Sequence, residues 1–336
     1  MEKNKNTYES YNETVEEFKN SFSYGSRNNL FFKYLGGKNI SENEFTIFIE
    51  ELLNVIIDDI DKDEFSELKK LIFNSQIKGY LPKSKNDKYT ADWDRVFNPA
   101  KYTYEDSPWT KFSKPLKKSK LSLISAGGVF CKDDDPIQPG GMTQEDAINK
   151  ISEFLKSPPT LAKIPNNISK EKLSIRHPGY DIRAAEKDPN VVFPYEILKN
   201  LHQEGVFASY TDNFYSFVGA SPQSEIIETY APKWAQMLKS HNVDAVLLVA
   251  AWPLCHMSVG HVSRIFESMG LSTVCFFVKS FMHLIEQMKI PRTIVTNNFI
   301  GRTIGKPYDL SNQTNVVRQG IELLSSGTIQ NSIKII

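Results

Sequence analysis

The chain has 336 residues, of which 40% are hydrophobic and 24% charged, and its 40 Lys and Arg residues balance 40 Asp and Glu residues. This composition is typical of a globular protein and argues against an extended surface for nucleic acid or anionic membranes. Three cysteines are too few, and odd in number, for a disulfide framework. There is no apolar leader and no run of about eighteen apolar residues, so we expect a cytoplasmic protein without membrane spans.

Residues 1–118 are predicted to form a helical and extended N-terminal region that packs on the rest of the chain. Ser41 and Glu44 form a capping box before the stretch FTIFIEELLNVIIDDI, and the apolar spacing there predicts helices over 41–78. Residues 79–118 are rich in aromatic side chains and irregular in pattern. We expect this segment to wrap over the sheet that follows.

From residue 119 onward, predicted strands alternate with predicted helices. Apolar runs predict strands at 121–130, 172–182, 206–222, 243–251, 271–278 and 292–299. Amphipathic segments predict helices at 142–157, 194–205, 224–242, 256–270, 280–289 and 312–326. This alternation is typical of an α/β fold of the Rossmann or flavodoxin type, with a mostly parallel sheet and helices on both faces. We therefore expect one α/β domain over 119–336.

Cys255 is the leading candidate for chemistry, because ligands of such sheets bind beyond the carboxyl ends of the strands. It stands where the apolar strand 243–251 passes into a helix. A thiol near a helix N-terminus has a lowered pKa, and His256 beside it can add positive charge when protonated. The alternative is a small buried residue at a turn. Cys275 lies inside an apolar run and is expected to belong to the core.

The other strand-end loops supply the remaining candidates: Gly127 and Gly128; Arg176, His177, Tyr180 and Asp181; and Ser216. His177 and Asp181 can supply acid/base chemistry, and Arg176 can hold a carboxylate. The alternative is that these residues have no role in chemistry and belong to a polar loop stabilised by its own hydrogen bonds. The AGG turn lacks the three spaced glycines of a dinucleotide fingerprint. We expect no metal and no cofactor.

Four stretches resemble a known family in their order and spacing. They are SPWTKFSKPLKKSKLSLISAGGVF at 107–130, RHPGYD at 176–181 with DPNVVFPYEIL at 188–198, FYSFVGASP at 214–222, and DAVLLVAAWPLCHMSVGHVSRIFESMGLSTV at 244–274. The family is selenoprotein B of glycine, sarcosine and betaine reductase, and the likeness points to its D-proline-reductase-like branch. The resemblance runs from about Ser107 to Leu324 and leaves residues 1–106 uncovered.

The resemblance implies thiol or selenol chemistry. Family members place selenocysteine or cysteine three residues before a second cysteine. The first attacks the substrate and cleaves a carbon–nitrogen bond reductively, and the second closes a selenenylsulfide or disulfide that thiols then reduce. The resemblance puts Cys255 at the second position and Trp252 at the first. An indole cannot act as a redox nucleophile. Either the chain lacks the redox pair because Trp252 stands in place of its first member, or residue 252 is a UGA-encoded selenocysteine in the native protein.

We therefore expect a thiol-dependent reductase that acts on a small amino acid or amine, with a thiol as electron donor. Cys255 would be the reactive thiol, and His177 and Asp181 would position substrate or move protons. Trp252, His256, Arg176, Tyr180, Ser216, Gly127 and Gly128 would bind the substrate. One alternative is a non-reductive tailoring or lyase step that uses a single cysteine. Another is a non-catalytic partner subunit, since the resemblance implies a homo-oligomer or a multi-subunit complex.

Overall fold

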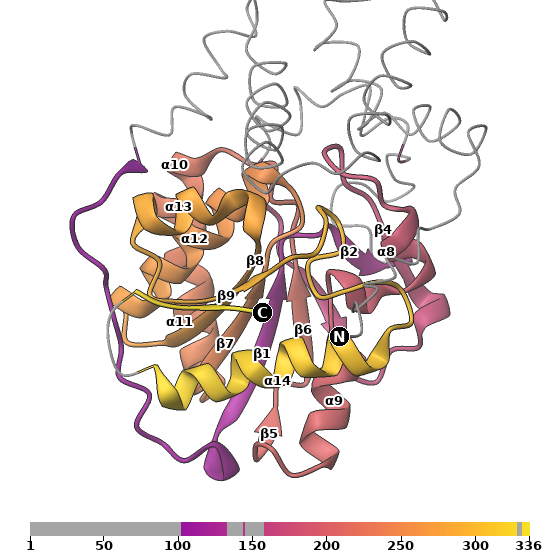
Figure 1. Cartoon of the computed structure of the whole chain (residues 1–336), viewed down its shortest axis with the longest axis horizontal. Helices are drawn as coiled ribbons and strands as arrows, with labels where there is room; N and C mark the ends of the chain where they lie inside the picture. Colours follow the sequence, from indigo (N-terminus) through magenta and orange to yellow (C-terminus); the bar gives the residue numbers. More distant parts are fainter. Residues whose placement is uncertain (1–101, 133–143, 145–157, 328–330) are drawn as a thin grey trace, which may run out of the picture.

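The computed structural model describes residues 102–132, 144, 158–327 and 331–336. Within these ranges an eight-stranded sheet forms the centre of the domain (Figure 1). Its strands are β1 (Lys120–Ser125), β3 (Ala162–Pro165), β5 (Ser209–Tyr210), β6 (Asn213–Ser216), β7 (Ala245–Val249), β8 (Ser272–Val278), β9 (Arg292–Thr296) and β10 (Ser332–Ile335). They follow the order β10-β9-β8-β7-β1-β6-β3, and β5 pairs with β1.

The sheet is mostly parallel, as the sequence predicts. Strands β1, β7, β8, β9 and β10 pair in parallel, whereas the edge strand β3 runs antiparallel to β6. Every residue of β7 and of β8 is buried. This is the pattern of central strands covered on both faces, which is why their sequences are continuous apolar runs. The short strands β3 and β10 were not predicted.

Helices cover both faces of the sheet (Figure 1). On one face α14 (Leu310–Ser326) packs on β7, β8 and β9 beside α9 (Tyr195–Gln203). On the other, α12 (Pro253–Ser268) packs on β7 and β8 between α11 (Ala231–Ser240) and α13 (Met282–Met288). Successive side chains of β8 point to opposite faces of the sheet and contact both helix layers. Phe276 packs against Gly320 of α14, whereas the ring of Phe277 lies 4.7 Å from that of His256 in α12.

Two predicted strands are broken in the structure. The run 121–130 divides into β1 and β2 (Val129–Cys131), because the chain turns at Gly128, whose φ is +70°. Strand β2 leaves the main sheet and pairs antiparallel with β4 (Leu173–Ile175), which is all that forms of the predicted strand 172–182. The run 206–222 is likewise divided between β5 and β6. The predicted helices at 41–78 and 142–157 lie outside the described residues, apart from Gln144, which is helical.

The remaining helical segments are short. The predicted helix 224–242 contains α10 (Gln223–Glu225), a π-helical turn over Ile226–Tyr230 and then α11. Helix α8 (Arg183–Lys187) follows the loop after β4 and was not predicted. Single 3₁₀ turns occupy Leu116–Lys118, Lys170–Lys172, Pro189–Val191 and Lys279–Phe281.

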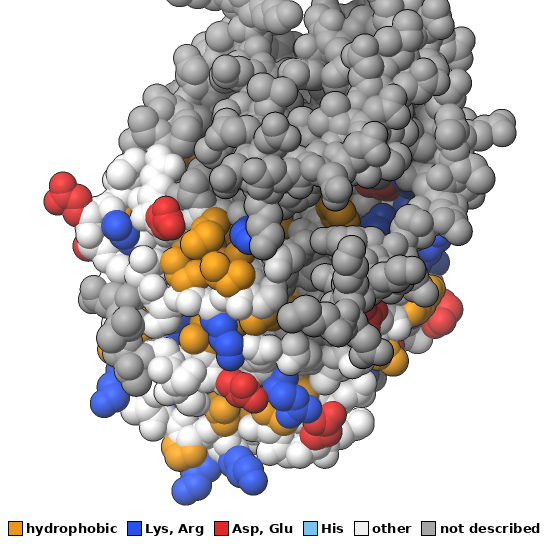
Figure 2. All heavy atoms as spheres, in the orientation of Figure 1, with side chains coloured by type: hydrophobic (Ala, Val, Ile, Leu, Met, Phe, Trp, Pro, Cys, Tyr) orange, Lys and Arg blue, Asp and Glu red, His pale blue; other side chains and the backbone are white. Residues whose placement is uncertain are grey.

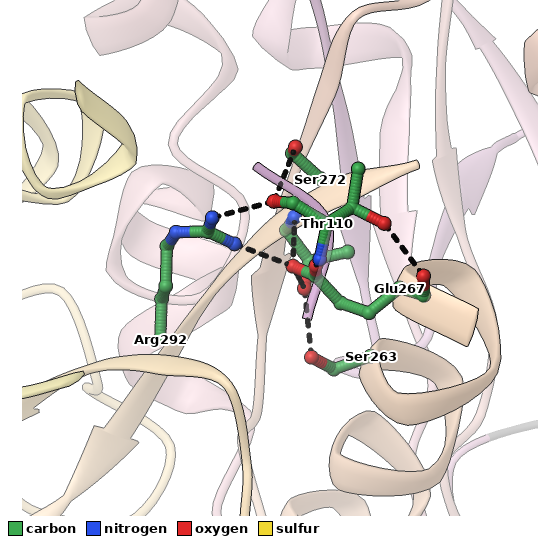
Figure 3. Close-up of polar contacts among 6 residues, drawn as sticks. Thr110, Ser263, Glu267, Ser272 and Arg292 are labelled. Carbon is green, nitrogen blue, oxygen red and sulfur yellow. Dashed lines mark hydrogen bonds and ion pairs between the residues drawn. The ribbon is translucent and has the colours of Figure 1, made fainter. Parts of the chain in front are cut away.

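A segment that we call the strap, residues 102–118, runs along α12 before the chain enters β1. Its Thr110 backbone N–H donates to Glu267 Oε2 at 2.5 Å, and its Thr110 carbonyl accepts from Arg292 Nη2 at 2.6 Å. Glu267 Oε1 lies 2.8 Å from Arg292 Nη1, and both side chains are fully buried. Figure 3 shows this cluster, with Ser272 also bonded to Thr110. The cluster fastens the strap to the end of α12 and the starts of β8 and β9.

The outer surface around α14 carries side chains of both charges together with hydrophobic ones, among them the exposed Tyr308 and Leu310 at the start of the helix. Figure 2 shows this face, where basic and acidic side chains lie intermixed over the lower half. The mixture agrees with the equal numbers of acidic and basic residues in the sequence. Among the described residues, no helix combines the length and the apolar character that crossing a membrane requires.

Candidate functional site

Cys255 lies at the carboxyl edge of the sheet, where β7 passes into α12. The strand ends at Val249 and the helix begins at Pro253, which suits the first helical position because no N–H is needed there. Trp252, the residue before the helix, is extended and makes no side-chain cap. Cys255 is the third residue of the helix, and its side chain is fully buried. The thiol therefore lies within the first helical turn.

Several loops meet at the Cys255 sulfur. His177 Nε2 lies 3.1 Å from Sγ, and the Ala126 carbonyl oxygen lies 3.3 Å from it. Gly219 closes another side, since a Cβ there would stand 2.7 Å from the sulfur. The chain after β1, the chain after β4 and the chain after β6 thus converge on the β7–α12 turn, as ligand sites of α/β sheets do.

His177 is held from two directions. The Gln144 side-chain amide donates to the His177 carbonyl at 2.8 Å and accepts from its backbone N–H at 3.0 Å. The Gly179 backbone N–H donates to His177 Nδ1 at 3.0 Å. The ring has no exposed surface, and this burial lowers the pKa of His177 to about 3. The imidazole is therefore neutral at physiological pH.

The environment of Cys255 does not give the lowered pKa that its place at a helix N-terminus predicts. Burial raises the pKa of its thiol to about 12, and backbone hydrogen bonds from Ala251, Trp252, Gly219 and Cys255 itself act in the opposite direction. Burying the thiolate away from water destabilises it by more free energy than the helix dipole supplies. The stabilisation by the dipole is typically below about 2 kcal/mol. In the closed site the thiol is protonated.

Trp252 forms a wall beside this pair. Its side chain is 1% exposed, and its ring lies 5.7 Å from the His177 ring in an edge-on arrangement. Gly179 lies against the indole so closely that a Cβ there would come within 2.2 Å of the ring. A glycine at 179 is therefore a condition for the indole to fit.

Tyr180 ties the His177 loop to the turn after β1. Its hydroxyl donates to the Gly127 carbonyl at 2.7 Å, and its ring lies 4.7 Å from that of His177. Burial raises the pKa of Tyr180 well above its usual value. At Gly128 a Cβ would meet the Arg176 carbonyl at 2.1 Å, so the two loops can approach only with glycine there.

Arg176 and Asp181 lie in the same loop as His177 and have other contacts. The Arg176 guanidinium is buried and stacks over the Phe130 ring at 4.8 Å. The Asp181 carboxylate accepts from Arg183 Nε at 2.9 Å and Nη2 at 2.6 Å. This fork-like pair anchors Asp181 at the start of α8.

Ser216 and His256, two further candidates, join neighbouring elements. Ser216 Oγ accepts from the Val129 backbone N–H at 2.9 Å, which links β6 to β2. His256 Nδ1 lies 2.7 Å from the Trp252 carbonyl oxygen, and Nε2 accepts from the Val278 N–H at 3.2 Å. These bonds connect the β7–α12 turn to the end of β8. They give His256 a role in the architecture of the site.

The structure thus brings Cys255, His177, Tyr180, Trp252 and Gly127 together. Sequence reasoning gave no role to three residues that complete the arrangement: Gln144, Gly179 and Gly219. The glycine of RHPGYD and the glycine of FYSFVGASP were visible signals, because glycine marks close approach of backbone. No signal pointed to Gln144. Within the described part of the chain, no three His, Cys, Asp or Glu side chains are grouped to hold a metal ion.

Residues 105–251 match the model of the family described as glycine/sarcosine/betaine reductase selenoprotein B. Over these residues the chain is similar to that family. The match ends directly before Trp252. Among solved structures, no match is found.

The curated relatives are subunits of reductases. The D-proline reductase subunit gamma of Acetoanaerobium sticklandii is 28% identical over 226 residues, which is 66% of this chain and 86% of the relative. The glycine reductase complex component B subunit gamma of Symbiobacterium thermophilum is 24% identical over 230 residues, 68% of this chain and 48% of the relative. The sarcosine reductase complex component B subunit beta of Peptoclostridium acidaminophilum is 24% identical, over 59% of this chain and 41% of the relative. The chain thus spans less than half of these two component B subunits.

Proposed function

We propose that the chain is a thiol-bearing subunit of an amino-acid reductase complex that cleaves a carbon–nitrogen bond of a small amino acid or amine. The carrying observation is the buried contact of 3.1 Å between Cys255 Sγ and His177 Nε2 at the carboxyl edge of the sheet. The named functions of the relatives, components of D-proline, glycine and sarcosine reductases, support the reaction class.

Reductive cleavage of a carbon–nitrogen bond consumes two electrons. If residue 252 is tryptophan, thiols from outside the chain must supply them. Attack by the Cys255 sulfur forms a carbon–sulfur bond and releases the amine. A donor thiol must then attack that sulfur, forming a disulfide and releasing the carbon with a proton, and a second donor thiol reduces the disulfide. Cys131 and Cys275 stand in β2 and β8, and no two of the three cysteines form a disulfide. In this route two donor thiols, such as those of one dithiol, supply the two electrons.

Other residues of the loop around His177 complete the proposal. The buried guanidinium of Arg176 suits a substrate carboxylate, and Tyr180 and Trp252 form the wall beside the sulfur. Asp181 would act together with Arg183. Because the Cys255 thiol has no exposed surface, substrate can reach it only when these loops separate.

The test is turnover by the complex that contains this chain, with dithiothreitol as donor and D-proline, glycine, sarcosine or betaine as substrate. With D-proline the expected product is the ring-opened δ-aminovalerate, detected by mass spectrometry. Cys255→Ser should abolish turnover. Cys275→Ala, at the other fully buried cysteine, should preserve it. Turnover that survives Cys255→Ser would refute the thiol assignment.

The identity of residue 252 decides between one thiol and a redox pair. Mass spectrometry of the 250–264 peptide from native cells, together with the codon, reads it directly. An unmodified indole supports the external-dithiol route. Selenium in the peptide would instead give a selenol three residues before Cys255, and the chain would carry both redox groups.

A second candidate, a non-reductive or non-catalytic subunit, is favoured by the burial of the Trp252 indole. A lyase or tailoring step would release the amine without consuming thiol, and His177→Ala would impair it more than Cys255→Ser. A partner subunit would leave turnover of the complex unchanged by both substitutions. Thiol consumption, measured alongside product, separates these outcomes from reduction.

A further inference from the structure

The hydrogen bonds around His177 have a fixed direction. A neutral imidazole carries one N–H, on either Nδ1 or Nε2. The Gly179 backbone N–H can only donate, and it lies 3.0 Å from Nδ1. Nδ1 must therefore present its lone pair, and the ring proton resides on Nε2. Nε2 is the atom that lies 3.1 Å from Cys255 Sγ.

We propose that the Gly179 N–H fixes His177 as the Nε2–H tautomer, so that His177 donates a hydrogen bond to the Cys255 sulfur and does not act as its base. The thiol proton then has its own acceptor, the Ala126 carbonyl oxygen at 3.3 Å. Each of the two donors thus has one acceptor. The opposite arrangement, with the thiol donating to Nε2, would leave both ring nitrogens without a proton.

The surroundings oppose the imidazolium that a thiolate–imidazolium pair would need. A protonated ring would set an N–H on Nδ1 against the Gly179 N–H at 3.0 Å. Rotation of the ring is opposed by Tyr180 and Trp252, whose rings lie 4.7 and 5.7 Å away. Burial, which lowers the pKa of His177 to about 3, acts in the same direction.

This inference rests on the proposed function for its chemical consequence. His177 Nε2–H would stabilise negative charge on the sulfur as the thiol reacts, as a positioning residue acting through Cys255. The thiol proton would go to the departing substrate nitrogen: the carbon–sulfur bond forms, the carbon–nitrogen bond breaks, and the amine leaves with that proton. The substrate amine therefore takes the part that a histidine base has in other cysteine enzymes.

The tautomer can be read without any turnover. The protein, labelled with ¹⁵N-histidine, is examined by long-range ¹H–¹⁵N correlation near neutral pH, and the His177 signals among six histidines are assigned with His177→Gln. We expect the Nε2–H pattern, in the parent and also in Cys255→Ala, because Gly179 is unchanged. An Nδ1–H or imidazolium pattern in the parent would overturn the proposal. A change of tautomer in Cys255→Ala would show that the sulfur, and not Gly179, sets it.

Turnover then tests the donor role. A glutamine amide can place an N–H near the position of Nε2, whereas an alanine has none, and neither can act as a base. We expect His177→Gln to stay within about tenfold of the parent and His177→Ala to lose roughly ten- to a hundredfold, the effect of one hydrogen bond to a charged group. Equal losses in both would overturn the donor role. Absent turnover in the parent would count against the proposed reductase alone, since the tautomer is measured independently.

Discussion

The cluster that fastens the strap makes a sharp prediction for stability. Glu267→Gln keeps the size and shape of the side chain but removes its charge. Arg292 would then remain as a cation without any exposed side-chain surface and without its ion-pair partner at 2.8 Å. Removing one partner of a buried ion pair costs about 3–5 kcal/mol, because the other charge is left buried.

The amide adds a second cost. Both carboxylate oxygens accept hydrogen bonds, Oε1 from the Thr273 backbone N–H at 2.6 Å and Oε2 from the Thr110 backbone N–H at 2.5 Å. A glutamine has one oxygen and one NH₂ group, so one of these N–H donors must face another donor. We therefore expect Glu267→Gln to lower the free energy of unfolding by about 4–5 kcal/mol. For a domain of this size, that loss lowers the melting temperature by roughly 10 °C or more.

Denaturant titration followed by circular dichroism measures this change. Glu204→Gln is the matched control, since Glu204 pairs with Arg318 at the surface with side chains 49% and 35% exposed. Losing that exposed pair should lower the free energy of unfolding by at most about 1 kcal/mol. A Glu267→Gln variant that is no less stable than Glu204→Gln would refute the reasoning, and would show that the strap is held by contacts other than this charge pair.

Two further predictions concern the site and His261, which packs against Tyr102 and Tyr104 of the strap. Gly179→Ala should destabilise the protein by about 1–3 kcal/mol, because the added methyl group collides with Trp252. Adding Trp252→Ala to the same chain should recover part of that loss. Additive effects of the two substitutions in a double-mutant cycle would contradict the contact. His177 and His261 are buried with a pKa lowered to about 3, below the unfolded value of about 6.5, so the unfolded chain binds their protons first. Stability should therefore fall as pH drops from about 6.5 toward 3, by roughly 1.4 kcal/mol per pH unit for each histidine. His261→Gln should flatten this slope between pH values of about 6 and 4, and an unchanged slope would contradict the buried neutral state.

The sequence by itself determined the fold class and the place of the thiol. Continuous apolar runs such as 245–249 and 272–278 are typical of strands covered on both faces, and the helical periods between them indicate parallel crossovers. The same pattern put Cys255 at a strand-to-helix junction. These are local signals, because each depends on residues close together in the chain.

Only the tertiary structure decided what surrounds that thiol. Ala126, His177 and Gly219 lie 129, 78 and 36 positions from Cys255 in the sequence, and no local period records their convergence on one sulfur. Burial also reversed the direction of its pKa, since helix position is local whereas exclusion of water is a property of the assembled layers. The tautomer of His177 also depends on the tertiary structure, because the folded loop directs the Gly179 backbone N–H at Nδ1.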